Sequence, residues 1–145
     1  MWGDYVFDLD DAYGFASSFL AEAIASHTYA KYEEKVLVLA MRRPQLPPTR
    51  FPFEPIIPKS KNACLGFGIY LSVPYGDAPG LDAARSLQQH ALETCVALGG
   101  RPYLACAPRL TPSMRHTLYG AEYKRFLALR NQFDPRALFN RSSVL

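Results

Sequence analysis

The order of two hydrophobic periodicities restricts the fold of this chain more than any other sequence feature. Four runs with the alternation or the β-branched content of strands lie at residues 4–7, 35–42, 63–73 and 101–107. Apolar residues spaced three and four apart, as on one face of a helix, occupy residues 12–24 and 81–98. This order is the split βαβ pattern. We therefore predict a ferredoxin-like α+β fold, in which two helices cover one face of a four-stranded antiparallel sheet and leave the other face bare.

The third predicted strand, "ACLGFGIYLSV", carries different side chains on its two faces. One parity holds the larger residues Leu65, Phe67, Ile69, Leu71 and Val73. The other parity holds Cys64, Gly66, Gly68, Tyr70 and Ser72. If the larger residues face the helices, the bare face carries mostly small ones. Glycine inside a strand usually marks the close approach of another element or of a ligand, and both readings stay open.

The chain is predicted to form one domain with a long internal connection and a helical tail. Its 145 residues fit a single domain. We expect residues 1–110 to form the sheet and its helices, and residues 111–145 to add C-terminal helices to the same domain. Six prolines between Pro44 and Pro58 exclude a helix or a central strand there, so residues 43–62 are predicted to form a loop or a lid.

Local signals predict where the helices begin and end. The aspartates Asp8, Asp10 and Asp11 are N-cap candidates for the first helix. Gly99 and Gly100 follow the second helix and are expected to end it as left-handed caps. Gly120 is expected to break the tail helix. The expected buried anchors of that tail are Tyr123, Phe126 and Leu127. Because the strand at 35–42 is apolar at both parities, we expect it to be covered on both faces.

Several classes of function lack their sequence signatures. The chain has no P-loop, dinucleotide-binding glycine motif, zinc-protease motif or serine-hydrolase elbow. Its cysteines, Cys64, Cys95 and Cys106, are odd in number and lack C-x-x-C spacing, which argues against a disulfide framework or a zinc cluster. Buried reduced thiols are the expectation, and no metal is expected.

The charge distribution and the hydropathy restrict the partners. From residue 101 onward the chain has eight basic residues and two acidic ones, which favours an anionic partner or a solvated basic helix face. Nucleic acid is not the expected partner, because Phe67 and Tyr70 face opposite ways and the RNA-binding strand motif lacks its basic start. We expect no membrane span and no signal peptide, and hence a cytoplasmic location.

Two C-terminal segments, "LGGRPYLACAPRL" and "LYGAEYKRFLALRNQFDPRALFN", carry a family resemblance. A glycine-ended helix, a G-R-x-Y strand, a Y-G run with spaced aromatics and a D-P-x-x-x-F end follow one another. This pattern resembles the C-terminal end of FAD-linked oxidases of the vanillyl-alcohol oxidase type, which include cytokinin dehydrogenases, aldonolactone oxidases and the decaprenylphosphoryl-ribose oxidase. The resemblance covers residues 85–140 well and residues 1–75 only loosely.

The resemblance implies that the chain is the cap, or substrate, domain of a truncated or split FAD-dependent oxidoreductase. FAD would be bound mainly by a partner domain or subunit that this chain lacks, so the chain would not be active alone. The enzyme would oxidise an alcohol-type or amine-type carbon of a small molecule by hydride transfer to flavin. The implied substrate-binding residues are Tyr70, Tyr103 and Cys106. Arg109 and Asn140 would lie near the cofactor, and no catalytic residue is assigned.

Two features separate this chain from the family pattern. Some relatives have a lysine three residues after the strand tyrosine, where this chain has Cys106, so Arg109 is the candidate for the missing positive charge. In a regular strand Tyr103 and Cys106 would point to opposite faces, so both line one site only through a bulge or at the strand end.

The alternative function is a stand-alone ferredoxin-like binding module without catalysis. Its bare sheet face would bind RNA, a small effector or a second copy of the chain. A homodimer through that face is therefore also consistent with the sequence.

Overall fold

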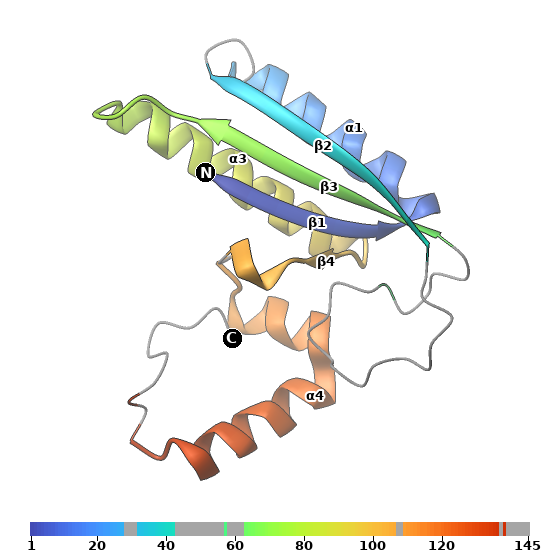
Figure 1. Cartoon of the computed structure of the whole chain (residues 1–145), viewed down its shortest axis with the longest axis vertical. Coiled ribbons are helices and arrows are strands. Elements are labelled where there is room, and N and C mark those ends of the chain that lie inside the picture. Colours follow the sequence, from blue (N-terminus) through green and yellow to red (C-terminus); the bar gives the residue numbers. More distant parts are fainter. Residues whose placement is uncertain (28–31, 43–56, 58–62, 107–108, 137, 139–145) are drawn as a thin grey trace.

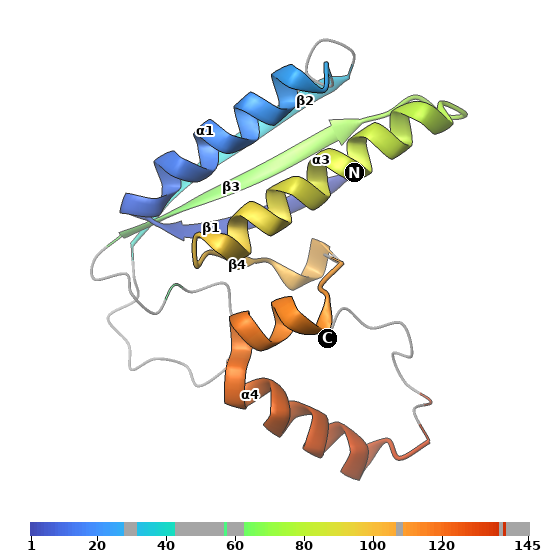
Figure 2. The same ribbon diagram turned by 180° about the vertical axis from the view of Figure 1, so that it is seen from behind.

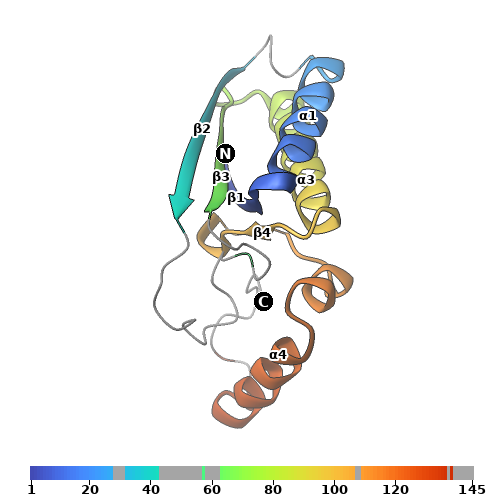
Figure 3. The same ribbon diagram turned by 90° about the vertical axis from the view of Figure 1, so that its right-hand side faces the viewer.

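Four strands form one antiparallel sheet in the order β2-β3-β1-β4 (Figure 1). The strands are β1 (Trp2–Asp8), β2 (Glu33–Arg42), β3 (Ala63–Ser72) and β4 (Arg101–Pro102). Helices α1 (Leu9–Ala25) and α3 (Ala78–Ala97) follow β1 and β3 and lie on the same face of the sheet (Figures 2 and 3). This computed structural model describes residues 1–27, 32–42, 57, 63–106, 109–136 and 138. The ferredoxin-like α+β prediction is confirmed.

The hydrophobic core lies between the sheet and the two helices. Antiparallel pairing sets Tyr5 opposite Phe67 and Phe7 opposite Leu65, so these residues share the face that the helices cover. Phe7 packs against Phe15 of α1 with ring centroids 4.3 Å apart. The larger residues of β3 therefore face the helices, as their parity predicts.

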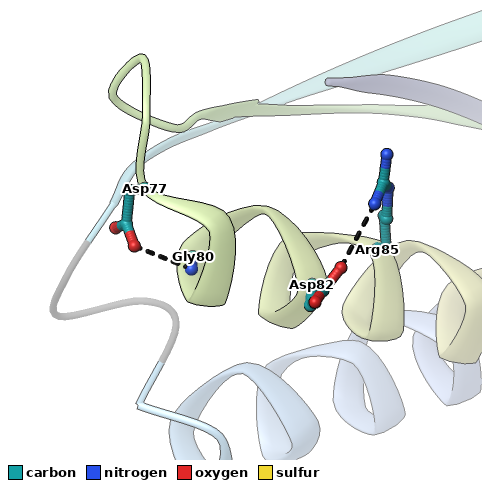
Figure 4. A network of polar contacts seen from close by, with 4 residues as sticks. All are labelled: Asp77, Gly80, Asp82 and Arg85. Carbon is teal, nitrogen blue, oxygen red and sulfur yellow. Dashed lines mark hydrogen bonds and ion pairs between the residues drawn. The ribbon is translucent and has the colours of Figure 1, made fainter.

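Side-chain caps begin both helices of this layer. Asp8 accepts a hydrogen bond from the Asp10 amide at the start of α1. Asp77 accepts one from the Gly80 amide, 2.9 Å away, at the start of α3 (Figure 4). One turn further along α3, Arg85 pairs with Asp82 at 3.1 Å on the helix surface (Figure 4).

The glycine pair at residues 99–100 ends α3 by a Schellman motif. The Gly100 amide donates to the Cys95 carbonyl at 2.8 Å, and the Gly99 amide donates to the Val96 carbonyl at 3.1 Å. Only Gly99 has left-handed backbone, with φ of 74°. The expectation of a left-handed Gly100 was wrong. That position needs glycine for space, because a Cβ there would lie 2.5 Å from Cε1 of Phe7.

Both outer strands differ from their predictions. β4 ends at Pro102 and is followed by the 3-10 turn η1 (Leu104–Cys106), so the prediction of a strand over 101–107 was too long; residue 107 lies outside the described residues. β2 lies at the opposite edge of the sheet, and its side chains from Val36 to Leu39 are exposed. The expectation that β2 is covered on both faces was wrong, because α1 packs over β1 and β3 while α3 packs over β1 and β4.

The tail forms one kinked helix, α4 (Pro112–Phe133), and the predicted break is confirmed at Gly120, with φ of 50°. The first half packs on the core through Leu118 and Tyr119, which are buried. The expected anchors Tyr123, Phe126 and Leu127 are only partly buried, because the second half turns away from the sheet after the kink (Figure 3).

The sheet face opposite the helices is the open face, formed by the side chains of alternating residues from Trp2 to Asp8 and from Cys64 to Ser72. One end of it is covered, since Ile57 is buried against Val6 and Cys64. The other residues of the Pro-rich segment 43–62 lie outside the described residues. The free end of the open face lies around Trp2 and Tyr70.

Candidate functional site

Three aromatic side chains, Trp2, Tyr70 and Tyr103, form an aromatic row at the free end of the open face. Trp2 and Tyr70 are register partners on β1 and β3, and their rings stack with centroids 6.2 Å apart and planes 3° apart. Tyr103 follows β4 on the other side of β1, and its ring centroid lies 6.4 Å from that of Trp2. All three are more than a third exposed, so the row leaves aromatic surface open to solvent.

Beside this row, a glycine leaves the open face without a projecting side chain. Gly68 is the register partner of Asp4, and a Cβ at Gly68 would lie 2.7 Å from Oδ1 of Asp4 and 3.0 Å from the Tyr70 ring. Glycine therefore lets the Asp4 carboxylate and the Tyr70 ring lie against the sheet. This explains one of the two strand glycines by close approach. Gly66 has more room, since its nearest neighbour would be the flexible end of Met41 at 3.1 Å.

A cavity of about 480 Å³ adjoins the aromatic row, on the side of β1 that faces β4. β1 contributes Trp2 and Asp4 to its lining, α3 contributes Gln88 and His90 among others, and the segment after β4 completes the wall. That segment contributes three side chains: Tyr103, Cys106 and Arg109. Because Trp2 and Tyr103 belong to both the row and the cavity, a ligand in the cavity would touch the aromatic row.

The end of β4 brings Tyr103 and Cys106 to the same side. The Tyr103 amide donates to the Asp4 carbonyl at 2.8 Å and so continues the pairing with β1 by one bond. The chain then leaves the sheet in η1, where the Cys106 amide donates to the Tyr103 carbonyl at 3.1 Å. A turn of about three residues returns the side chain to one side. Tyr103 and Cys106 therefore share the cavity through the strand end, one of the two ways that the sequence allowed.

The cavity thiol is uncharged at neutral pH. Burial raises the pKa of Cys106 to about 11, and the nearby Asp4 carboxylate adds to this effect, while a backbone hydrogen bond from Asp4 acts against it. A protonated thiol is a weak nucleophile and carries no charge. Arg109 is exposed at the cavity wall and supplies a positive charge beside it.

The residues proposed from the sequence divide into three groups. Tyr103, Cys106 and Arg109 meet at one cavity. Tyr70 does not line this cavity and joins it through the ring of Trp2. Asn140 lies outside the described residues.

Sequence reasoning missed Trp2 and Asp4, which occupy the centre of the site. The predicted strand began at residue 4 and ended at residue 7, whereas β1 begins at Trp2. The signal was present in the sequence, because Trp2, Asp4 and Val6 share a parity opposite to the core residues Tyr5 and Phe7. Extending the strand by two residues would have placed the tryptophan on the open face.

Comparison with known proteins leaves this site without a template: no family model, no curated protein and no solved structure matches the chain. In the part of the chain that the structure describes, no cluster of three or more His, Cys, Asp or Glu residues could hold a metal ion. Among the described helices, none is long and apolar enough to cross a membrane.

Proposed function

We propose that this chain is the substrate-covering part of an FAD-dependent oxidoreductase, in which the open face lies against a flavin ring bound mainly by another polypeptide or segment. The observation that supports this function best is the exposed aromatic row beside the cavity. Stacked and tilted aromatic rings, beside a position where Gly68 has no side chain, suit contact with a planar ring system. The sequence resemblance of residues 85–140 points to the same class of enzyme.

The described residues fit the ring of FAD better than its phosphates. Each of the three described α-helices begins with a capping side chain, Asp8, Asp77 or Thr111. Two of these caps are aspartates, which would repel a pyrophosphate from a helix N-terminus. The chain would therefore contribute surface around the ring, while the partner holds the rest of the cofactor.

Bound FAD would supply the oxidising group, which accepts a hydride from an alcohol-type or amine-type carbon. The cavity beside the aromatic row would hold that substrate. Tyr103 would donate a hydrogen bond that orients the substrate. The Asp4 carboxylate, half-buried between the row and the cavity, would accept the proton that the substrate hydroxyl or amine loses. Arg109 would supply the positive charge that the Cys106 thiol cannot.

The test is the visible spectrum of the chain purified alone and after co-expression with the polypeptide encoded directly upstream. The proposal expects a yellow co-purifying complex that releases flavin in acid and loses its colour with a reducing substrate. Trp2→Ala should shift the flavin absorption of this complex, and Tyr75→Ala, at an exposed position outside the site, should not. A folded chain that is colourless in both preparations would contradict the proposal.

The aromatic row also favours a second candidate, binding of single-stranded RNA without catalysis. Aromatic side chains on an open sheet stack with unpaired bases, and this platform does not need Phe67, which is buried among the helices. Trp2 is the only tryptophan, so its fluorescence reports on this face directly. Saturable quenching by a single-stranded RNA, weakened by salt, would favour this candidate, and its absence would exclude it.

A further inference from the structure

The edge strand β2 exposes apolar side chains on both faces of the sheet. The exposed fractions are 44% for Val36, 46% for Leu37, 53% for Val38 and 49% for Leu39. Val36 and Val38 are register partners of Ile69 and Phe67, so they lie on the helix side, while Leu37 and Leu39 lie on the open face. Free edge strands are normally protected by charge, proline or a bulge, and an apolar edge readily pairs with another strand. The centre of β2 has none of these protections.

The nearest helix extends the apolar surface of this edge. Ser18 of α1 hydrogen-bonds His90 of α3 at 3.1 Å, which fixes the side of α1 that faces α3. At 100° per residue, Tyr13, Leu20 and Ile24 lie on the opposite side of α1, toward β2. Leu20 is 47% exposed and Ile24 is 65% exposed. Together with Val36 and Val38 they form an apolar strip along the helix layer and the sheet edge.

We propose that a second copy of this chain pairs with β2, so that two antiparallel β2 strands join the two sheets about a two-fold axis. An axis normal to the sheet keeps the helices of both copies on one side, and opposed residues then share a face. The two α1 strips would meet over the joined edge. Main-chain hydrogen bonds would form along β2 while its apolar side chains leave water.

Charge along β2 selects the register of this pairing. With Val38 of each copy opposite its counterpart, Leu37 stands opposite Leu39 and position 34, a glutamate, stands opposite Arg42. An antiparallel pair then sets opposite charges at both ends of an apolar centre. Shifting by two residues in either direction takes position 34 out of register with Arg42. The strand is therefore complementary to itself in the register centred on Val38.

This interface is independent of the function proposed above. The strand order places β2 at one edge of the sheet, and the cavity lies toward the opposite edge, where β1 faces β4. A partner could occupy the cavity and the aromatic row while the second copy occupies β2. The oligomeric state therefore tests the dimer whether or not the chain contacts flavin.

Sedimentation of the purified chain tests this proposal first. The wild-type chain should have the mass of two chains, and Val38→Lys should have the mass of one, with unchanged circular dichroism. Tyr75→Lys makes the same type of change on an exposed turn and should stay dimeric. A monomeric wild-type chain, a dimeric Val38→Lys variant or a monomeric Tyr75→Lys variant would overturn the proposal.

Charge reversal tests the register and does not require a change in the apolar centre. Arg42→Glu alone and Glu34→Arg alone each set like charges opposite one another and should weaken the dimer. The double variant restores opposite charges and should recover the wild-type dissociation constant. Failure of the double variant to recover it, with both single variants folded, would overturn the pairing centred on Val38.

Discussion

Replacing Gly100 by alanine tests how tightly the end of α3 is packed against β1. A Cβ at this position would lie 2.5 Å from Cε1 of Phe7 and 2.9 Å from Sγ of Cys95, and both side chains are fully buried. Neither neighbour is the free end of a flexible chain, so the core must shift. Overpacking of this kind costs about 1–3 kcal/mol. We expect Gly100→Ala to lower the unfolding free energy by this amount.

Gly14→Ala is the matched control, because its added methyl group has room. The nearest atom to a Cβ at Gly14 is Cδ1 of Leu98 at 3.7 Å, an ordinary contact. Alanine is preferred over glycine inside a helix by about 1 kcal/mol, so this variant should be stabilised. The two variants should therefore differ by about 2–4 kcal/mol in urea unfolding followed by circular dichroism. Equal midpoints for the two variants would refute the packing described at Gly100.

Three further outcomes follow from the same structure. Gly99→Ala should lower the unfolding free energy by about 1 kcal/mol in urea unfolding, because Gly99 has left-handed backbone. Gly99→Asn should lower it less, because asparagine tolerates this conformation. Equal losses for the two variants would contradict the cap. Burial raises the pKa of Cys95 and of Tyr5 above their ordinary values of 9.0 and 10.0. The folded state therefore keeps these two protons to a higher pH than the unfolded state does. Stability should be complete below about pH 9. It should fall by about 1.4 kcal/mol per pH unit above pH 9 through Cys95, and by about as much again above pH 10 through Tyr5. A flat urea midpoint from pH 8 to about pH 11 would be inconsistent with this burial. The rate of alkylation of Cys106 by iodoacetamide should rise steadily toward pH 11, since the pKa of this thiol is about 11. A rate that levels off just above pH 9 would show an ordinary thiol.

The fold could be predicted from the sequence because its signals are local and agree with one another. Helical spacing in α1 and α3, the two parities of β3 and the glycines after α3 each predict an element. The order of these elements is that of the ferredoxin-like fold. The covering of β2 was mistaken because an apolar run has the same sequence pattern in a covered central strand and in an exposed edge strand. Whether an edge strand is buried depends on where the helices lie, and the periodicity of the strand carries no information about that.

The site was predicted in part, for a similar reason. Tyr103, Cys106 and Arg109 are close in sequence, so any turn after β4 keeps them close in space. Trp2 and Asp4 reach the same cavity through pairing of β1 with β3 and β4, which depends on long-range register. The 3-10 turn at Leu104–Cys106 was not predicted because "RPYLACA" has the apolar content of a strand. The strand ends at Pro102 because β4 pairs with β1 over two residues only, and the sequence does not show how long that pairing is.

The central claim is that the open face lies against a flavin ring, and the fluorescence of Trp2 in the co-expressed complex tests it most directly. Subtracting the spectrum of the Trp2→Phe complex isolates the signal of Trp2 from that of any tryptophan in the partner. We expect this signal to be strongly quenched while flavin is bound and to recover when flavin is released under conditions that keep the complex together. A Trp2 signal that does not change on flavin release would contradict the account, because a ring in contact with Trp2 cannot leave its emission unchanged.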